Sequence, residues 1–456
     1  MTRKTFPLTN RNLCDNFAYL TKDNKTTGDT KGFVSTQRFI DTVVALSKQL
    51  PDDKQHIINL CGNRYLFAVV LCATVLKNQV NLLPSNRNIA TQKRLSERYN
   101  NTYVIHDGSE TDPDLLAIDL GKEGISDIQT VNEIPEIDVN QLAAISFTSG
   151  STGDAKPNEK SWRTFVDSTI INSHYMLPKS AETIQLLATV PAQHMWGLET
   201  SVLMALFANI CVVDSKPLFP QDIQTLIEML PAPRMMVSTP VHLRAVVGSE
   251  LKFPKLETVL CATSPLTQEL ATQVEALFNT KMREVYGCSE IGSMAVRETA
   301  HTDIWDKFDG IHFDQQASNQ ILAHTEHVKE SATLGDFIEL LNEHQFRLKG
   351  RTDDMIDIAG KRGSLNEINK VLLSFSELID GIVFFPPQDR PIPRLVAIVA
   401  LKDGVSKKQL ADHFREYLDP AFIPRPIIQV EKLPREENGK LPKQALLHFY
   451  QELIKN

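Results

Sequence analysis

A hydroxyl- and glycine-rich loop closed by a lysine is the first segment whose residues could do chemistry. Residues 147–156 read Phe-Thr-Ser-Gly-Ser-Thr-Gly-Asp-Ala-Lys and directly follow the apolar run 142–145. The glycines let backbone amides approach an anion, the hydroxyls add hydrogen bonds, and the lysine adds a positive charge. The spacing does not match the Walker A motif, and an ordinary surface loop has a similar composition. The phosphate-binding hypothesis concerns Thr148, Ser149, Gly150, Ser151, Thr152, Gly153 and Lys156.

Four further segments carry polar residues in a fixed order along the chain. The first reads Val-Tyr-Gly-Cys-Ser-Glu at 285–290, and Leu-Gly-Asp follows at 334–336. Residues 346–356 read Phe-Arg-Leu-Lys-Gly-Arg-Thr-Asp-Asp-Met-Ile, and residues 433–441 read Leu-Pro-Arg-Glu-Glu-Asn-Gly-Lys-Leu. With the first loop, this ordered set resembles the adenylate-forming superfamily of acyl-CoA synthetases, nonribosomal-peptide adenylation domains and beetle luciferases. The resemblance covers nearly the whole chain and implies ATP and Mg²⁺ as cofactors.

The expected chemistry is activation of a carboxylic acid. A carboxylate oxygen attacks the α-phosphorus of ATP and pyrophosphate leaves, so two anions must be brought together and the developing charge neutralised. The loop at 148–156 suits the β- and γ-phosphates. Glu290 resembles the family residue that holds Mg²⁺, a role that one carboxylate commonly fills, although a solvated loop glutamate is the alternative. Ser289 stands where the family normally has threonine and keeps the hydroxyl.

The resemblance also implies which residues hold the nucleoside. Asp336 resembles the aspartate that binds the ribose hydroxyls, and Arg351 the arginine that contacts the nucleotide. Each could instead be a capping acid or a surface cation. Tyr286 resembles the aromatic residue that stacks on adenine, although a half-buried strand tyrosine is the more frequent use. The neighbouring positions assigned to the nucleotide are Gly287, Thr263 and Ser264.

Lys440 is the residue most closely tied to catalysis. It follows a Pro-Arg-Glu-Glu-Asn-Gly turn, and in the family this lysine bridges the acyl carboxylate and the α-phosphate. A lone lysine in a charged loop would be solvated. Its place in the ordered set favours the catalytic role.

The second half-reaction requires a thiol to attack the acyl adenylate. In the family, the small domain rotates about a hinge, and Asp353 matches the hinge position. Gly360 matches a segment that would leave room for a pantetheine arm, although a simple turn is the alternative. His194 resembles the residue that shields the carboxylate and later admits the thiol; a structural histidine is the competing interpretation.

The acyl and thiol pocket is assigned to Trp196, Ala262, Cys288 and Gly360. No aspartate matches the one that anchors an amino group in amino-acid-specific relatives, so a plain carboxylic acid, aromatic or aliphatic, is favoured. No carrier-protein serine motif follows the small domain. The acceptor is therefore expected to be coenzyme A or a discrete acyl carrier protein. The first loop departs from the family pattern, since Asp154-Ala155-Lys156-Pro157 replaces its Pro-Lys-Gly ending.

Composition limits the class of protein. A chain of 456 residues exceeds what one hydrophobic core usually supports, so at least two domains are expected. The net charge of -8 argues against a nucleic-acid partner. Six cysteines without metal-binding spacing are typical of a reducing compartment. The cysteine pattern, and a basic N-terminus without a following apolar segment, predict a cytoplasmic protein. The most apolar stretch, 65–76, is too short to span a membrane.

Helix-like and strand-like segments alternate over most of the chain. This alternation predicts an α/β domain with mostly parallel sheets over 1–352. Shorter elements follow and predict a small α+β domain over 353–456 that carries Lys440 and rotates about the hinge. The predicted helices are 35–50, 65–76, 197–208, 266–278, 364–375 and 407–418, and the predicted strands are 57–60, 184–190, 210–213, 235–237, 259–261, 381–385 and 395–401.

Two other functions fit parts of the pattern. A luciferase-like oxidoreductase shares the adenylation step, but nothing in the sequence indicates an oxygen pocket. A nucleotide-binding scaffold that has lost catalysis is the third hypothesis, against which the intact Lys440, Glu290 and Asp336 argue. The favoured function is an ATP-dependent, AMP-forming acid–thiol ligase.

Overall fold

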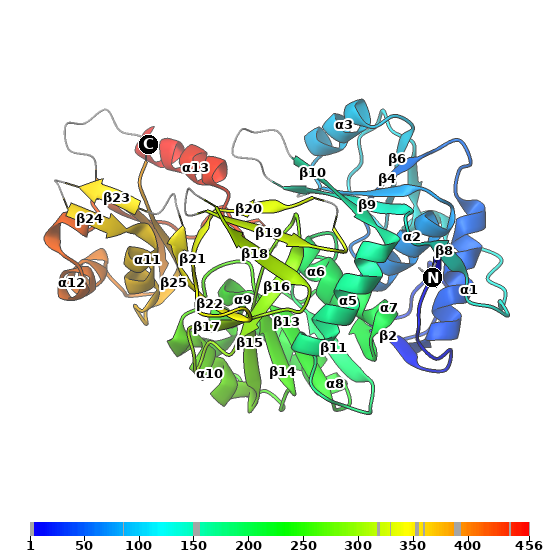
Figure 1. The fold of residues 1–456 in the computed structure, drawn as a ribbon, viewed down its shortest axis with the longest axis horizontal. Coiled ribbons are helices and arrows are strands. Elements are labelled where there is room, and N and C mark those ends of the chain that lie inside the picture. The colour runs from blue at the N-terminus through cyan, green and yellow to red at the C-terminus, as the bar shows by residue number, and fades with distance from the viewer. Residues whose placement is uncertain are drawn as a thin grey trace.

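The computed structural model describes residues 4–84, 86–148, 156–316, 320–328, 330–351, 355–358, 361–386, 394–436 and 439–455. Figure 1 shows a large N-terminal domain and a smaller C-terminal domain, with the two chain termini far apart. The fold confirms the predicted α/β class with a smaller C-terminal domain. The predicted boundary between residues 352 and 353 lies outside the described residues.

The centre of the large domain is an eleven-stranded sheet. A central block of parallel strands, from β2 through β15, is continued at both ends by antiparallel strands. The carboxyl ends of the parallel strands therefore meet at one edge, where ligands of α/β proteins commonly bind. In spatial order the strands are β21 (Asp336–Leu340), β22 (Gln345–Arg351), β17 (Ile304–Lys307), β16 (Gly292–Arg297), β15 (Lys281–Cys288), β14 (Thr258–Cys261), β13 (Arg234–Ser238), β11 (Ile184–Ala188), β12 (Ile210–Val213), β2 (Asn16–Leu20) and β3 (Gly32–Ser35).

A second sheet of six strands lies beside the first. The predicted phosphate-binding segment connects two of its strands in the sequence. Its parallel strands end in an antiparallel pair, in which Lys156 of β10 lies opposite Thr148 of β9. Residues 149–155, which join these two strands, lie outside the described part of the chain. In spatial order the strands are β10 (Lys156–Ser161), β9 (Leu142–Thr148), β5 (Val80–Leu83), β4 (His56–Asn59), β6 (Thr102–His106) and β7 (Ala117–Asp119).

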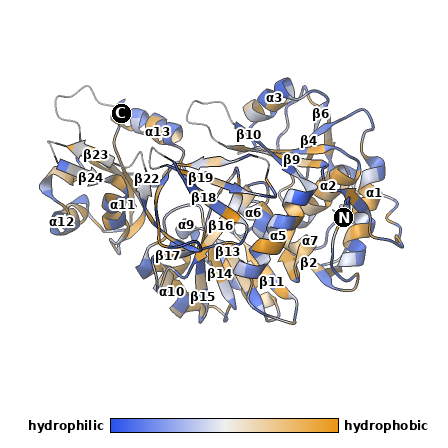
Figure 2. Ribbon diagram, viewed as in Figure 1, coloured by the Kyte–Doolittle hydropathy of each residue, from blue (hydrophilic) through white to orange (hydrophobic). Residues whose placement is uncertain are grey.

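Helices cover these sheets and bury their apolar faces. In α2 nearly every side chain is buried, as expected for a helix apolar on all sides, and it packs against α1. Figure 2 shows apolar residues concentrated on the central strands, whereas α3 at the margin is mostly hydrophilic. The helices are α1 (Thr36–Gln49), α2 (Arg64–Leu76), α3 (Ile89–Arg98), α4 (Leu120–Glu123), α5 (Trp162–Met176), α6 (Met195–Gly197), α7 (Met204–Phe207), α8 (Pro220–Met229), α9 (Pro240–Val247) and α10 (Gln268–Phe278).

One predicted helix, 197–208, has a different interior. A π-helical segment, η1 (Leu198–Leu203), separates α6 from α7. π-Helical turns widen the helix and often occur at functional sites. Short sheets complete the large domain, formed by β1 (Thr5–Pro7) with β8 (Glu136–Asp138), and by β18 (Ile311–Gln315), β19 (Ile321–Thr325) and β20 (Ala332–Leu334).

The small domain has hydrophobic cores of its own, separate from those of the large domain. One core lies between α11 and the central β26, and the other lies between β26 and α13. Its elements are β23 (Met355–Ile358), β24 (Lys361–Ser364), α11 (Leu365–Leu373), β25 (Leu378–Phe384), β26 (Val396–Leu401), α12 (Lys407–Tyr417), η3 (Pro420–Phe422), β27 (Ile427–Gln429) and α13 (Lys443–Lys455).

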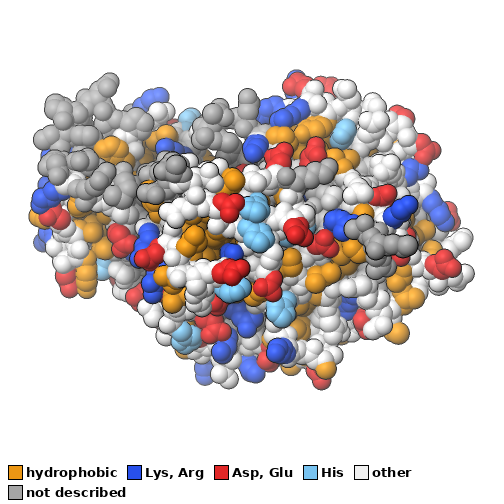
Figure 3. All heavy atoms as spheres, viewed as in Figure 1, with side chains coloured by type: hydrophobic (Ala, Val, Ile, Leu, Met, Phe, Trp, Pro, Cys, Tyr) orange, Lys and Arg blue, Asp and Glu red, His pale blue; other side chains and the backbone are white. Residues whose placement is uncertain are grey.

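The distribution of charge on the surface and the hydropathy of the helices agree with the composition of the chain. On the face seen in Figure 3, acidic and basic side chains of the described residues are intermixed. Among the described residues, no helix is both long enough and apolar enough to cross a membrane.

Candidate active site

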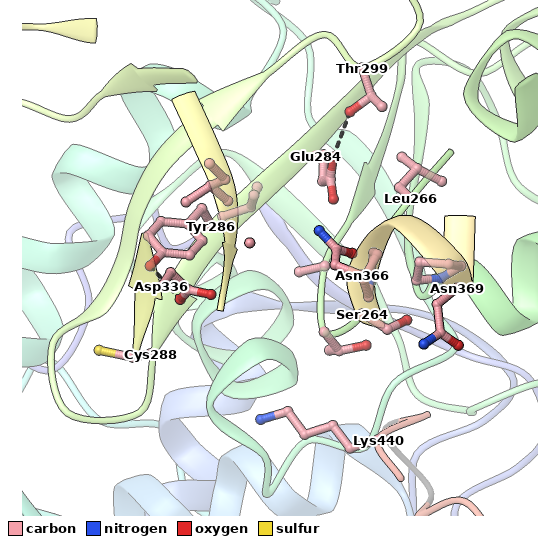
Figure 4. A pocket seen from close by; sticks show the side chains of 18 of the residues that line it. Ser264, Leu266, Glu284, Tyr286, Cys288, Thr299, Asp336, Asn366, Asn369 and Lys440 are labelled. Atoms are coloured by element: carbon pink, nitrogen blue, oxygen red, sulfur yellow. Dashed lines mark hydrogen bonds between the residues drawn. The ribbon is translucent and has the colours of Figure 1, made fainter. Parts of the chain in front are cut away.

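A cleft of about 2110 Å³ lies between the two domains. Its walls come from the carboxyl ends of the parallel strands, from α6 and η1, from α11, and from the loop before α13. Figure 4 shows side chains from both domains facing this space. The predicted site residues that line it are Lys156, Trp196, Ala262, Thr263, Ser264, Tyr286, Gly287, Cys288, Ser289, Glu290, Asp336 and Lys440.

Tyr286 and Asp336 form the best-defined polar pair of the cleft. The Tyr286 hydroxyl donates to Asp336 Oδ2 at 2.8 Å, as the dashed line in Figure 4 shows. The tyrosine ring also contacts Trp305 and Phe346, with ring centroids 5.7 and 5.8 Å apart. An aromatic ring held on its edges, beside a carboxylate that faces the cleft, is suited to a base and its sugar.

Asp336 is also placed opposite the predicted nucleotide-binding arginine. In the antiparallel pair of β21 and β22, Asp336 is the Cα partner of Arg351. The pairing brings the two backbone positions together although they lie fifteen residues apart in the sequence. The side chain of Arg351 is outside the described part of the structure.

The turn after Tyr286 requires glycine. A Cβ at Gly287 would lie 2.4 Å from the carbonyl oxygen of Gly292, because β15 and β16 approach closely across an irregular register. Thr263, on the neighbouring wall, has φ of +87°, which a β-branched residue rarely adopts. Its Oγ1 is buried without a partner. Strained backbone of this kind is concentrated at binding sites.

Lys440 enters the cleft from the small domain. Figure 4 shows its side chain extending from the last part of the chain beneath Asp336 and Ser264. Its loop is fastened by Arg435, which forms two 2.7 Å contacts with the Asp380 carboxylate and donates to the carbonyl of Gly439 at 2.9 Å. The position of the lysine is therefore fixed by β25 of the small domain.

The residues predicted to contact the acyl group begin at α6. Trp196 is buried, and its indole Nε1 donates to the carbonyl of Ser238 at 3.2 Å. Cys288 also lines the cleft, and burial raises the pKa of its thiol to about 12. His194 lies just before α6 and does not line the cleft, whereas its neighbour Met195 does. The geometry thus does not place the imidazole with the other predicted site residues.

The segment predicted to bind phosphate is described only at its margins. Lys156 lines the cleft, with its Nζ 4.0 Å from the Glu330 carboxylate. Ser289 and Glu290 are half-buried at the turn between β15 and β16. The remaining predicted positions, which are Ser149, Gly150, Ser151, Thr152, Gly153, Asp353 and Gly360, lie outside the described residues, as does the side chain of Thr148.

Two charged residues near the site were not predicted from the sequence. Lys160 on β10 is 1% exposed and Glu199 on η1 is 3% exposed. Burial lowers the pKa of Lys160 and raises the pKa of Glu199. The sequence carried no signal for the burial of Lys160, because Lys-Pro-Asn-Glu-Lys-Ser at 156–161 shows no alternation of apolar and polar residues. Glu199 lines the cleft, whereas Lys160 does not. Asn366 and Asn369 of α11 and Arg244 of α9 line the cleft without having been predicted.

The cleft lies between two domains, with an aromatic–carboxylate pair on one side and a lysine on a tightly held loop on the other. This arrangement is typical of a two-domain enzyme that uses a nucleotide. The comparisons with known proteins give the family. The AMP-binding enzyme model matches residues 26–311, and the model of the AMP-binding enzyme C-terminal domain matches residues 367–440. The chain belongs to the AMP-binding enzyme family, which confirms the resemblance found in the sequence.

Two of the curated relatives are named as ligases. The 3,4-dihydroxybenzoate–[aryl-carrier protein] ligase of Bacillus anthracis is 22% identical over 377 residues, which cover 77% of this chain and 86% of that protein. The mitochondrial malonate–CoA ligase of Homo sapiens is 32% identical over 120 residues. That alignment covers 25% of this chain and 21% of the human protein.

Solved structures share the fold over nearly the whole chain. The o-succinylbenzoate CoA synthetase of Bacillus subtilis, in complex with the acyl-adenylate OSB-AMP, has a TM-score of 0.75 at 16% identity. That match covers 94% of this chain and 95% of the synthetase. ATP-bound MatB from Rhodopseudomonas palustris has a TM-score of 0.78 at 15% identity, with 97% of each chain covered.

Proposed function

We propose that this protein is an ATP-dependent acid–thiol ligase. It activates a carboxylic acid to an acyl-AMP with release of pyrophosphate, and then transfers the acyl group to a thiol. The observation that carries this proposal is the entry of Lys440 into the cleft that holds the Tyr286–Asp336 pair. Two halves of one reaction site, contributed by distant parts of the chain, fit catalysis better than a binding scaffold.

We assign a binding or catalytic role to each residue according to its charge and chemistry. Tyr286 and Asp336 hold adenine and ribose, and Arg351 contacts the nucleotide. Lys440 bridges the acyl carboxylate and the α-phosphate, so that its positive charge offsets the charge that develops in the transition state. Lys156, at the end of the glycine-rich loop, binds the departing pyrophosphate.

The cleft has a suitable residue for a magnesium ion. Glu290 presents a half-buried carboxylate to the cleft, and no ion pair with it occurs among the described residues. Mg²⁺ commonly takes one carboxylate together with phosphate oxygens and waters, so this donor set fits. When bound, the ion would neutralise phosphate charge.

The substrates follow from the pocket and the relatives. A plain carboxylic acid enters beside Trp196, Ala262 and Cys288, and the acceptor is coenzyme A or the phosphopantetheine of a discrete acyl carrier protein. Both kinds of acceptor occur in the names of the relatives. We assign the hinge to Asp353 and room for the thiol arm to Gly360, as the family resemblance implies, whereas the predicted shielding role of His194 has no support in the lining of the cleft. A cytoplasmic location suits six free cysteines.

A screen for pyrophosphate release tests the proposal. The full-length protein is incubated with ATP, Mg²⁺ and a panel of aromatic and aliphatic acids, with and without coenzyme A or a carrier protein. We expect release that depends on the acid, and a thioester only when the thiol is present. Pyrophosphate release that is independent of every acid and thiol tested would count against the assignment.

The Lys440→Ala variant is the most direct test of a single residue. We expect Lys440→Ala to lower acid-dependent pyrophosphate exchange by about a thousandfold, while ATP binding persists, because the lost cation acts mainly in the transition state. The control is Lys432→Ala, which removes an exposed lysine of the same domain that does not line the cleft. Unchanged exchange in Lys440→Ala would refute the role of this lysine.

A further inference from the structure

The turn that carries Glu290 is held from beneath by two buried side chains of opposite charge. Cys288, at the edge of the cleft in Figure 4, ends β15, and Gly292 begins β16. Lys160 lies under this turn with 1% of its surface exposed. Its Nζ donates to the backbone carbonyl of Glu290 at 2.6 Å. The lysine thus binds the peptide group of the very residue whose carboxylate faces the cleft.

Glu199 holds the other end of the same turn. Its Oε2 accepts a hydrogen bond from the Ser293 hydroxyl at 2.6 Å. Its Oε1 lies 2.4 Å from the position that a Cβ at Gly292 would occupy, and Gly292 has φ of +102°. Only glycine at this position allows the carboxylate to approach, so the π-helical segment and the turn fit together at one point.

These contacts differ from those of an ordinary buried ion pair. No ion pair between Lys160 and Glu199 is found within 4.0 Å in the described structure, although each carries charge that favours the charged form of the other. Each group instead makes its short contact with the turn. Burying two charges costs several kcal/mol per ion unless their hydrogen bonds are well placed. Apolar residues could fill the same volume, so the presence of two buried charges requires a local explanation.

Another buried cation in the same domain shows the contrast. Arg64 is 2% exposed and donates to the backbone carbonyls of Ala188 and Val190. Arg64 does not line the cleft, and its contacts join elements of the core. Lys160 and Glu199 both act on the five residues from Ser289 to Ser293.

We propose that Lys160 and Glu199 are positioning residues that fix the orientation of Glu290 toward Mg²⁺–ATP. The inference rests on the proposed function of Glu290 as the magnesium-holding carboxylate. A charge-assisted hydrogen bond is shorter and stronger than a neutral one, so an ammonium holds the Glu290 peptide more firmly than an uncharged donor would. Groups behind a metal-holding residue commonly set metal affinity in this way.

Nucleotide affinity as a function of magnesium concentration tests the inference without relying on turnover. The dissociation constant of ATP is measured by calorimetry over a series of Mg²⁺ concentrations for the wild type and for Lys160→Met. We expect the Mg²⁺ concentration needed for half of the affinity gain to rise about tenfold. ATP affinity without Mg²⁺ should stay within about twofold, because the side chain does not line the cleft.

Lys307→Met is the matched control. Lys307 Nζ also donates to a backbone carbonyl, that of Ile311, at 2.6 Å, and it lies on β17, in the sheet that carries the turn at Glu290, but outside the cleft. Any general effect of removing such a contact should appear in both variants. A magnesium shift in Lys160→Met no larger than in Lys307→Met would overturn the inference.

A second variant covers the case in which Lys160→Met does not fold. Ser293→Ala removes one hydroxyl and with it the contact to Glu199, and we expect a magnesium shift of about threefold to tenfold. An unchanged magnesium dependence in a folded Ser293→Ala would also overturn the inference. If the wild type bound ATP equally well with and without Mg²⁺, the proposed function of Glu290 would fail, whereas a failure confined to the variants would leave that function standing.

Discussion

A glycine, Gly439, precedes Lys440 at a point where the small domain closely approaches the large domain. Its φ is +80°, and a Cβ there would lie 3.2 Å from Thr239 Oγ1 of the large domain. The backbone at this residue therefore touches the other domain directly. A side chain of any size would push the loop, and with it Lys440, away from the cleft.

Gly439→Ala should thus slow adenylation more than it lowers stability. We expect a loss of about 1 kcal/mol of stability, because alanine is strained at this φ, and a fall of about tenfold or more in acid-dependent pyrophosphate exchange. Gly404→Ala is the control, since Gly404 has the same φ of +80° in the same domain with nothing within 4 Å. Equal exchange rates in the two variants would show that the close contact does not matter.

Helix α9 contains a buried histidine that makes the stability of the fold depend on pH. His242 lies in its first turn, with Nδ1 2.9 Å from Thr189 Oγ1 and 3.3 Å from Thr239 Oγ1. Burial, and then the charge of Lys216, lower the pKa of His242 from 6.5 to about 4. Between these values the unfolded chain binds more protons than the folded one. Stability therefore falls as the pH falls through this window.

His242→Gln should reduce the sensitivity of the fold to acid. The histidine accounts for a loss of about 2 kcal/mol between pH 7 and pH 5, and glutamine does not titrate there. The fall in melting temperature between these pH values should be smaller in the variant than in the wild type. His448→Gln, at an exposed position of α13, serves as the control. Equal falls in all three proteins would contradict the prediction.

In the molecule as a whole, an arginine of the large domain forms a hydrogen bond with the small domain. Arg244 of α9 donates from Nη1 to the carbonyl of Leu373 in α11 at 3.2 Å. Asp380, which fastens the Lys440 loop, lies near enough to raise the pKa of Arg244 against the effect of burial. This contact stabilises the arrangement in which Lys440 is in the cleft.

Arg244→Met should weaken that arrangement selectively. Loss of a hydrogen bond from a charged group costs about 1.5–3 kcal/mol, so adenylation should slow by about tenfold. Thioester formation from added acyl adenylate should change less. The two half-reactions are measured separately, by pyrophosphate exchange and by release of AMP. A greater loss in the second half-reaction would refute this role of Arg244.

Asp353→Pro should give the opposite pattern. Proline fixes φ at the proposed hinge, so domain rotation after adenylation should be hindered. We expect thioester formation to fall by about tenfold more than pyrophosphate exchange. Equal losses in both half-reactions would argue against rotation at this residue.

Hydropathy patterns predicted the buried elements well. Residues 65–76 form α2 from Arg64, and the predicted strand 210–213 is β12. The π-helical interior of 197–208 could not be predicted, because hydropathy periodicity does not distinguish a π-helical turn within a buried helix. The antiparallel continuation of the large sheet was missed for a similar reason, since sequence periodicity does not specify which strands pair.

The site was predicted where the chemistry lies in short ordered motifs. Tyr286, Asp336 and Lys440 share one cleft, as their order in the chain suggested. Lys160 was missed because a charged residue within a strand ordinarily indicates a solvent-facing position. Its burial arises only when β10 lies beneath the turn between two strands of the other sheet.

Thr239, against which Gly439 packs, directly follows Ser238, whose carbonyl accepts the indole of Trp196. The residue that holds Trp196 at the proposed acyl pocket and the residue that Gly439 approaches, next to Lys440, are thus consecutive. An amino-acid change that enlarges the pocket for a bulkier acid would shift the peptide on which the lysine depends. Evolution toward new substrates in this enzyme would therefore carry a penalty in rate, unless a compensating change restores the fit at residue 439.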